Sequence, residues 1–483
     1  MKKINYNELN MQFSKSTDIE LRPFTINANS NFTAYIFCVD GLIDALTFDE
    51  AVLRPLSLNR KLSECKTEDE IIELLIDGAA YHAFASITED ADDLVLKVLS
   101  GNAAVFFDNK KAVVFDVRKF ESRSVEEPQE ETAIKGAKDC FVETIRTNTS
   151  LIRRRLRTPN LIIEQGTLGK VSQIDYAIAY IDNIADMQIV KRLKNRLKAI
   201  DFDNIPTVSF VEEFVIDNKN SLFPQAFYSQ RPDRVSSNLT DGRVALIIGG
   251  TPFVYMFPCQ LVSLMQSPED YSQNYLIISV LRVLRYTCMV ISLLLPALYI
   301  AMANFHTEMI PMQLAISIQT AKADVPFNSF IEVFGLLIGF EILMEAGLRI
   351  SKNLGQAISV VGALVVGQAS VDAKIVSPVV LIVTAVTAIT AFTVPFADLS
   401  NTVRVLRFVV AIFAALWGFF GITIITTAIL IHLCSLDNYG ICYLSPIADS
   451  RGNRFKDTIF RFKVSSFKLR PYKVAPYNIR KQG

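Results

Sequence analysis

Residues 286–303 read YTCMVISLLLPALYIAMA, a run without a charged side chain. A transmembrane helix needs about 20 apolar residues, so this run is long enough to cross a bilayer. Further long apolar runs follow at residues 354–368, 375–395 and 408–433. Before residue 275, strand-like and helix-like stretches alternate with polar turns, as in a water-soluble α/β protein. The sequence therefore predicts a soluble α/β region followed by an all-α, multi-pass transmembrane domain.

The charge of the chain is balanced overall but not along its length. The 49 Lys and Arg residues equal the 49 Asp and Glu residues, which gives no reason to expect nucleic acid as a partner. After residue 449 the chain becomes strongly basic, as in a cytosolic segment that faces anionic membrane lipid. The first residues, MKKINYNELNMQFSKS, lack the apolar core of a signal peptide. We therefore expect both the N-terminal region and the tail to be cytosolic.

Two stretches of the soluble region repeat one order of elements. Each opens with a buried strand, at residues 34–39 and 176–181, which runs into an acidic turn and a helix. Each closes with two apolar runs joined by a turn rich in Gly, Asn or Asp, which indicates a β-hairpin. This repeat predicts two related α/β subdomains with mixed sheets. The expected division is a variable segment 1–33, a first subdomain 34–121, a linker with a basic helix 122–171, a second subdomain 172–274, a transmembrane helical domain 275–435 and a basic cytosolic tail 436–483.

The linker contains residues 141–157, FVETIRTNTSLIRRRLR, which predict a strongly basic helix. Such a helix could meet phosphate, lipid headgroups or an acidic partner. We favour a solvated linker helix that packs on its Phe141, Ile145 and Ile152 side.

The soluble region offers no pattern typical of an enzyme. It contains no nucleophile elbow, P-loop or dinucleotide fingerprint. Asp40 with Asp44, and Asp182 with Asp186, lie at strand-to-helix turns, where capping is favoured over catalysis or cation binding. The seven cysteines have no regular spacing, and we expect buried free thiols. The sequence therefore predicts a protein that is not an enzyme and holds neither metal nor cofactor.

One apolar segment, residues 326–350, carries ionisable side chains. These candidates for an ion path or an intramembrane ion pair are Glu332, Glu341, Glu345 and Arg349. Glu345 and Arg349 lie one helical turn apart and can pair. Because charges at membrane depth usually face a bundle interior or water, the segment is either a core helix of an assembly or an amphipathic helix in the interface. The sequence does not decide whether the glutamates form an ion path or a structural ion pair.

The next segment, residues 354–370, reads LGQAISVVGALVVGQAS and gathers small side chains near one face. Small residues let helices approach closely, and they can also leave a narrow water path when several copies surround an axis. We favour close packing, with a pore lining as the alternative. The candidate residues for either role are Gly355, Ser359, Gly362, Val366, Gly367 and Gln368.

The apolar runs do not add up to a consistent topology. A cytosolic start and a cytosolic tail require an even number of crossings, whereas the predicted runs are odd in number. They are residues 286–303, 326–348, 354–370, 375–395 and 408–433. One of them is then re-entrant, interfacial or split. Our candidates are residues 326–350 and the final run, which contains Gly418 and Gly421.

Several motifs occur along the chain in one order. They are ETIRTN at 143–148, LIRRR at 151–155, RPDRV at 231–235, DGRVA at 241–245, QSPEDY at 266–271, LLLPALY at 293–299, FEILMEAGLR at 340–349, GQA at 367–369 and VSP at 376–378. This series resembles the GerA spore germination protein family, typified by the A subunit of the GerA receptor. The similarity extends from about residue 40 to residue 444.

The resemblance implies a subunit of a germinant receptor in the inner membrane of the spore. Such a subunit works with a permease-like B subunit and a lipoprotein C subunit, and its family is thought to form a ring with a nutrient-gated channel for monovalent cations. The related SpoVAF proteins share this architecture, so an accessory channel subunit is one alternative. A secondary transporter is another. Its signature would be inverted repeats in the membrane half, whereas the repeat here lies in the soluble half.

Overall fold

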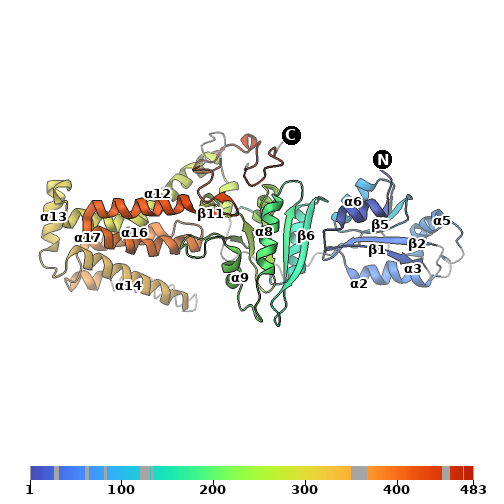
Figure 1. The fold of residues 1–483 in the computed structure, drawn as a ribbon, viewed down its shortest axis with the longest axis horizontal. Helices are drawn as coiled ribbons and strands as arrows, with labels where there is room; N and C mark the ends of the chain where they lie inside the picture. Colours follow the sequence, from blue (N-terminus) through green and yellow to red (C-terminus); the bar gives the residue numbers. More distant parts are fainter. Residues whose placement is uncertain are drawn as a thin grey trace. The chain divides into compact units, whose positions relative to one another are not determined.

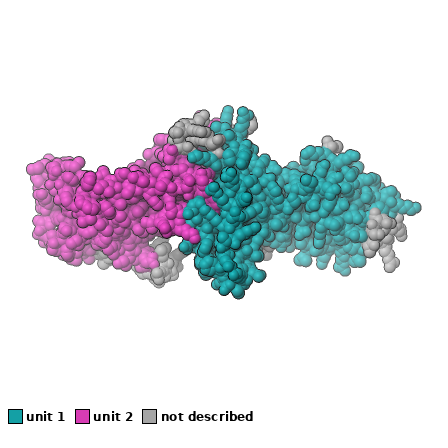
Figure 2. Space-filling view, viewed as in Figure 1, with its two compact units in different colours: residues 1–217, 226–259, 467–483 teal, residues 218–225, 260–466 magenta. Residues whose placement is uncertain are grey.

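The computed structural model describes residues 2–26, 32–59, 62, 65–80, 84–119, 131, 135–349, 367–448, 457–471 and 473–481. The chain divides into two compact units, coloured teal and magenta in Figure 2. The first unit comprises Met1–Asp217, Ala226–Cys259 and Phe467–Gly483, and the second comprises Asn218–Gln225 and Gln260–Ser466. The change from an α/β region to a helical region, expected at residue 275, accordingly falls a little earlier in the chain.

The first unit contains two five-stranded sheets of the same topology (Figure 1). Their strand orders are β1-β2-β4-β5-β3 and β6-β7-β9-β10-β8. The strands of the first sheet are β1 (Ile19–Thr25), β2 (Thr33–Val39), β3 (Ala85–Thr88), β4 (Ala103–Phe106) and β5 (Ala112–Phe115). Those of the second are β6 (Leu161–Leu168), β7 (Ile174–Ile181), β8 (Phe227–Ser229), β9 (Val244–Ile248) and β10 (Val254–Phe257). The two related subdomains predicted from the sequence are therefore present.

The prediction of mixed sheets is wrong. Every neighbouring pair of strands in both sheets is antiparallel. The closing hairpin of each copy was visible in the sequence, but the direction of the strand that follows the intervening helices was not. In each sheet, the strand that follows these helices pairs antiparallel with the second strand of the closing hairpin: β3 with β5, and β8 with β10.

The segment 1–33, expected to be variable and separate, belongs to the first subdomain. β1 pairs with β2 along its whole length, from Ile19 opposite Val39 to Thr25 opposite Thr33. Helix α1 (Tyr6–Phe13) buries Leu9 and Phe13. β1 is an edge strand that is exposed along most of its length, so it lacks the apolar alternation that reveals a buried strand.

Alternate residues of the first sheet enter two hydrophobic clusters. Ile36 and Cys38 of β2 pack with Val52 and Leu56 on one face, whereas Phe37 packs on the other. This follows from the two-residue period of a strand. The first face is covered by α2 (Ala45–Phe48), the π-helix η2 (Asp49–Leu53), α3 (Arg54–Leu58), α5 (Glu68–Leu74) and η3 (Leu75–Ala79), and the second by α1 and α6 (Ala91–Leu99). Figure 1 shows α2 and α3 on one side of the sheet and α6 on the other.

The second copy has α8 (Met187–Lys198), α9 (Val208–Val215) and α10 (Pro232–Thr240), and α7 (Ile145–Arg155) precedes it. Helix α7 is not the solvated linker that we expected. Seven consecutive residues of α7, from Thr147 to Arg153, are buried. The Arg153 guanidinium binds Asp18 of the first copy, with Nε 2.7 Å and Nη2 2.9 Å from its carboxylate oxygens, and Nη1 donates to the Leu161 carbonyl at 2.8 Å. The basic helix therefore joins the two copies through an internal ion pair.

The four aspartates at the strand-to-helix turns have structural roles. Asp186 caps α8 by accepting a hydrogen bond from the Gln188 amide at 2.9 Å, as predicted. Asp44 is the N-cap residue of α2, but its side chain accepts no capping hydrogen bond, so the prediction of capping is wrong there. The hydrogen bond from Lys119 lowers the pKa of Asp44. Asp40 and Asp182 pair with Arg146 and Lys15, respectively. Across the described residues, no group of three metal-ligating side chains gathers in one place.

None of the seven cysteines forms a disulfide, but only part of the burial prediction holds. Four of them, Cys38, Cys140, Cys259 and Cys288, are buried, whereas Cys434 is exposed. Burial raises the pKa of the Cys38 and Cys259 thiols to about 12. These two thiols therefore stay protonated and unreactive at neutral pH.

The second unit is mainly helical. Its elements are α11 (Leu261–Met265), the 3-10 helix η4 (Pro268–Tyr271), α12 (Tyr275–Asn304), η5 (Thr307–Met309), α13 (Met312–Lys322), α14 (Ser329–Arg349), α16 (Pro378–Ala391), α17 (Ala397–Ser435), the strands β11 (Asp437–Asn438) and β12 (Ile441–Cys442), and η7 (Val464–Ser466). Side chains of α12, α14, α16 and α17 share one hydrophobic cluster, which includes Ile300, Leu337, Val380 and Val410.

Helix α17 reverses direction at Gly418, which has the non-helical dihedrals φ +57° and ψ −137°. Near one end of the helix, the Thr402 hydroxyl donates to the Leu222 carbonyl at 2.7 Å. Near its other end, His432 Nε2 lies 2.9 Å from the hydroxyl of the adjacent Ser221. A straight helix would hold Thr402 and His432 about 45 Å apart, at 1.5 Å per residue. The final apolar run is therefore a helical hairpin, broken at a glycine that we had named.

Among the described residues, two helices are long and apolar enough to cross a membrane, α12 and α17, with mean hydropathies of 1.9 and 2.5. Helix α16 is a shorter apolar helix. The two halves of α17, residues 397–417 and 419–435, each come close to the roughly 17–25 residues that a transmembrane helix needs.

Candidate functional site in the helical region

Glu332 lies in the first turn of α14 and is 2% exposed. Its Oε2 accepts a hydrogen bond at 2.8 Å from the backbone N–H of Ser377, the N-cap residue of α16. Its Oε1 lies 3.7 Å from Nζ of Lys322, at the end of α13, and this ammonium also donates to the Ser329 hydroxyl at 2.5 Å. The carboxylate therefore meets the positive end of one helix and a lysine from another.

The oxygen atoms around Glu332 keep hydrogen-bonding capacity. Within the described part of the chain, Glu332 Oε1, the Tyr299 hydroxyl and the Ser377 hydroxyl are buried and have no hydrogen-bond partner. Tyr299 of α12 lies near Glu332 and Ser377. Carboxylate and hydroxyl oxygens are the ligands that hard cations prefer. This end of the helical region therefore gathers three oxygen atoms that can bind a cation.

Glu341, further along α14, is placed differently. It forms ion pairs with Arg404 and Arg407, both from the first half of α17. Arg404 is also held by Asn401, whose side-chain oxygen lies 2.9 Å from its Nη1. The Arg407 side chain is 3% exposed and that of Glu341 is 26% exposed. Two arginines thus neutralise the carboxylate, and they come from another helix rather than from its own.

The other predicted site residues are only partly described. Glu345 lies on an exposed part of α14, and Arg349 ends that helix with its side chain outside the described set. Their ion pair therefore stays a prediction. Gly355, Ser359, Gly362 and Val366 lie outside the described residues.

Two residues of the small-residue segment can be placed. Gly367 is buried, and a Cβ added there would lie 3.2 Å from Leu381 Cδ1 of α16, which indicates close helix contact at this position. Gln368 is exposed.

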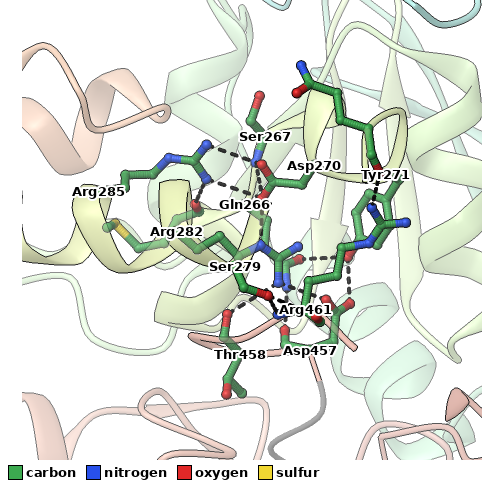
Figure 3. Close-up of polar contacts among 12 residues, drawn as sticks. Gln266, Ser267, Asp270, Tyr271, Ser279, Arg282, Arg285, Asp457, Thr458 and Arg461 are labelled. Carbon is green, nitrogen blue, oxygen red and sulfur yellow. Dashed lines mark hydrogen bonds and ion pairs between the residues drawn. The ribbon is translucent and has the colours of Figure 1, made fainter. Parts of the chain in front are cut away.

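A further cluster, at the start of α12, was not anticipated. Arg282, 1% exposed, donates from Nε to Asp270 Oδ2 at 2.8 Å and from Nη1 to Asp457 Oδ1 at 2.7 Å (Figure 3). Asp270 also binds Arg285, and Asp457 accepts a hydrogen bond from the Tyr271 hydroxyl at 2.6 Å. Asp270 and Tyr271 belong to the motif QSPEDY, whereas Asp457 comes from the C-terminal segment. The sequence signal was an arginine inside an apolar helix, and it was missed because its partners are distant in sequence.

The fold and these sites define a class of protein in which a duplicated α/β unit precedes apolar helices joined by internal ion pairs. The family model described as Bacillus/Clostridium GerA spore germination protein matches residues 7–473. The chain belongs to this family. The resemblance stated from the sequence motifs is thereby confirmed.

Individual relatives are similar over almost the whole chain. Spore germination protein B1 of Bacillus subtilis is 36% identical over 95% of this chain and 94% of its own length. Spore germination protein KA of the same organism is 35% identical over 95% of this chain and 84% of its own. GerLA of Bacillus cereus is 34% identical over 95% and 92%. The crystal structure of the N-terminal domain of the A subunit of the Bacillus megaterium spore germinant receptor GerK3 is 27% identical, covers 52% of this chain and 91% of its own, and has a TM-score of 0.41.

Proposed function

We propose that this chain is the A subunit of a nutrient-responsive germinant receptor and forms part of an oligomeric channel that releases monovalent cations from the spore. Membership of the GerA family over residues 7–473 supports the role in germination. The receptor would contain a permease-like B subunit and a lipoprotein C subunit, with several copies of this chain in a ring. It lies in the inner membrane of the spore, with the soluble unit and the tail in the cytosol.

The reversal of α17 supports a multi-pass topology with an even number of crossings. Counting its two halves separately adds one crossing to the odd number of apolar runs. The chain then returns to the side from which it entered. A cytosolic tail beside a cytosolic N-terminal region is consistent with such a path, and it agrees with the preference of basic segments for that side.

The observation that carries the channel proposal is the environment of Glu332. An ionisable side chain inside an apolar helical region is costly, and it is usually retained for ion or substrate movement when no structural role accounts for it. Oε2 of Glu332 has a structural role because it anchors the N-terminus of α16. Oε1, with the hydroxyls of Tyr299 and Ser377, is then available to a monovalent cation. A cation at this position competes with Lys322, which lies 3.7 Å from the same oxygen.

The test is a flux measurement on the complete receptor. The complex of A, B and C subunits is reconstituted in liposomes loaded with potassium, and release is followed after addition of nutrient. We expect release that depends on nutrient and on this chain. A complex that assembles and binds nutrient but releases no cation would contradict the proposal. Accumulation of a substrate by vesicles that contain this chain alone would instead identify a transporter.

A further inference from the structure

Arg282 of α12 and Arg461 of the C-terminal segment each have a buried N–H group without a hydrogen-bond partner in the described chain. Arg282 is 1% exposed, and its Nη2 has no hydrogen-bond partner. Arg461 is 5% exposed, and its Nε has none, although its Nη1 donates to the Gln273 carbonyl at 2.7 Å. A guanidinium cannot lose its charge, so its donors need an acceptor when they are buried. These two groups therefore call for an acceptor that other described residues do not supply.

The two guanidinium groups converge on one side chain. The central carbon of Arg282 lies 5.7 Å from the centre of the Tyr271 ring, and that of Arg461 lies 5.4 Å from it. Figure 3 shows Tyr271 and both arginines in one cluster. Tyr271 is itself 50% exposed, so the cluster has a side that is open to the surface of this unit.

The charges of the cluster do not balance. Arg282, Arg285 and Arg461 stand against Asp270 and Asp457, which leaves an excess positive charge. Both carboxylates are already engaged, Asp270 by Arg282 and Arg285, and Asp457 by Arg282 and Tyr271. An anion would supply both the missing acceptor and the balancing charge for these five residues. Arginine suits phosphate in particular, because its planar donors match the phosphate oxygens.

The cluster lies beside an apolar surface. In the same turns of α12, Leu276, Ile277, Val280 and Leu284 are exposed, from 53% to 69%. In the topology proposed above, α12 enters the membrane with residues 286–303, so these side chains precede the crossing and lie in the interface of the cytosolic leaflet. The arginines then lie at the depth of the headgroups, where lipid phosphates are concentrated.

We propose that Arg282 Nη2 and Arg461 Nε bind the phosphate of an anionic phospholipid. The proposal rests on the membrane placement of α12. Because Arg461 and Asp457 come from the C-terminal segment and Arg282 comes from α12, the lipid fixes this segment to the start of the helix. Ser279 of α12 already binds the backbone of Arg461, with its hydroxyl 2.9 Å from the carbonyl oxygen, so the two donors are held in place before the lipid arrives.

The test measures lipid binding to the purified full chain in detergent. Retention of phosphatidylglycerol is followed by native mass spectrometry, with phosphatidylcholine as the zwitterionic comparison. Arg461→Gln is expected to weaken phosphatidylglycerol binding roughly tenfold, the loss expected for one charge-assisted hydrogen bond. Arg480→Gln is the matched control, because it removes the same charge from an exposed position in the tail and should bind as the wild type does. Arg461→Lys, which keeps the charge but loses the Nε–H, is expected to fall between the two.

Hydrogen exchange at residues 457–461 checks that each variant keeps this segment folded. If the segment unfolds in Arg461→Gln, the comparison is made with Arg461→Lys instead. Wild-type retention by Arg461→Gln, or equal retention of the two lipids, would overturn the proposal. Inorganic phosphate that binds as tightly as phosphatidylglycerol would assign the site to a free anion and would also overturn it. The assay needs neither nutrient nor other subunits, so its failure leaves the receptor proposal standing.

Discussion

Glu332 and Glu341 lie on the same helix, yet their surroundings differ in kind. Glu341 faces two arginines of α17, and both of its oxygens are used in ion pairs. Glu332 is more deeply buried, but a backbone N–H and a lysine 3.7 Å away are its closest positive partners in the described chain. The comparison teaches that an ionised side chain among apolar helices can have either of two roles. It can hold two helices together through ion pairs, as Glu341 does, or it can leave one oxygen available to a ligand, as Glu332 does. The number of its partners distinguishes the two cases.

The largest expected loss of stability follows from a change at Glu341. Glu341→Gln leaves Arg404 and Arg407 close together without their carboxylate. Breaking a buried pair costs about 3–5 kcal/mol, and the partial exposure of Glu341 favours the lower end, about 3 kcal/mol. We expect a lower melting temperature and much less protein in the membrane. Exchanging Arg407 for Gln as well should restore part of the loss. An unchanged melting temperature for the single variant would show that the arginines do not depend on Glu341.

A smaller effect is expected at the reversal of α17. Gly418 has a positive φ, and a Cβ there would lie 3.2 Å from Phe305 Cβ. Holding a non-glycine residue in such a conformation costs about 1–3 kcal/mol, so Gly418→Ala should destabilise the helical unit by that amount. The control is Gly335→Ala in α14, where an added Cβ meets nothing within 4 Å. Equal thermal stability of the two variants would contradict the hairpin.

The smallest effect is expected for Glu345 and Arg349. Glu345 is exposed, and the pair would lie at the end of α14, where headgroups and water begin in the proposed topology. Exposed pairs contribute about 0.2–1 kcal/mol. A double-mutant cycle with Glu345→Gln and Arg349→Gln, read out as thermal stability, should give a coupling in this range. A coupling as large as that at Glu341 would mean that a neighbouring subunit buries the pair.

Local sequence patterns predicted the parts of the fold that local physics decides. The closing hairpins, β4–β5 and β9–β10, follow from apolar runs around polar turns, and Asp186 caps α8 as its position indicates. Gly418 was a candidate break because glycine tolerates the dihedrals of a sharp reversal. β1 was missed because an exposed edge strand carries no strong alternation.

The partners of charged side chains could not be predicted in the same way. Arg404 and Arg407 were visible in the sequence, but only the path of α17 brings them to Glu341. Likewise, Arg153 meets Asp18 only once the two copies are folded against α7. A pattern can show that a charge needs a partner, whereas the identity of that partner is fixed by tertiary structure.

The most direct test of the account compares Glu332 with a surface glutamate in nutrient-dependent potassium release from liposomes that contain the complete receptor. Glu332→Gln keeps an oxygen for the Ser377 amide but removes the charge that would attract a cation. At matched protein levels, we expect it to reduce release roughly tenfold, equivalent to about 1.4 kcal/mol. Glu308→Gln, which changes a side chain that is 74% exposed, should release potassium as the wild type does. Wild-type release by Glu332→Gln would contradict the assignment of Glu332 to the cation path.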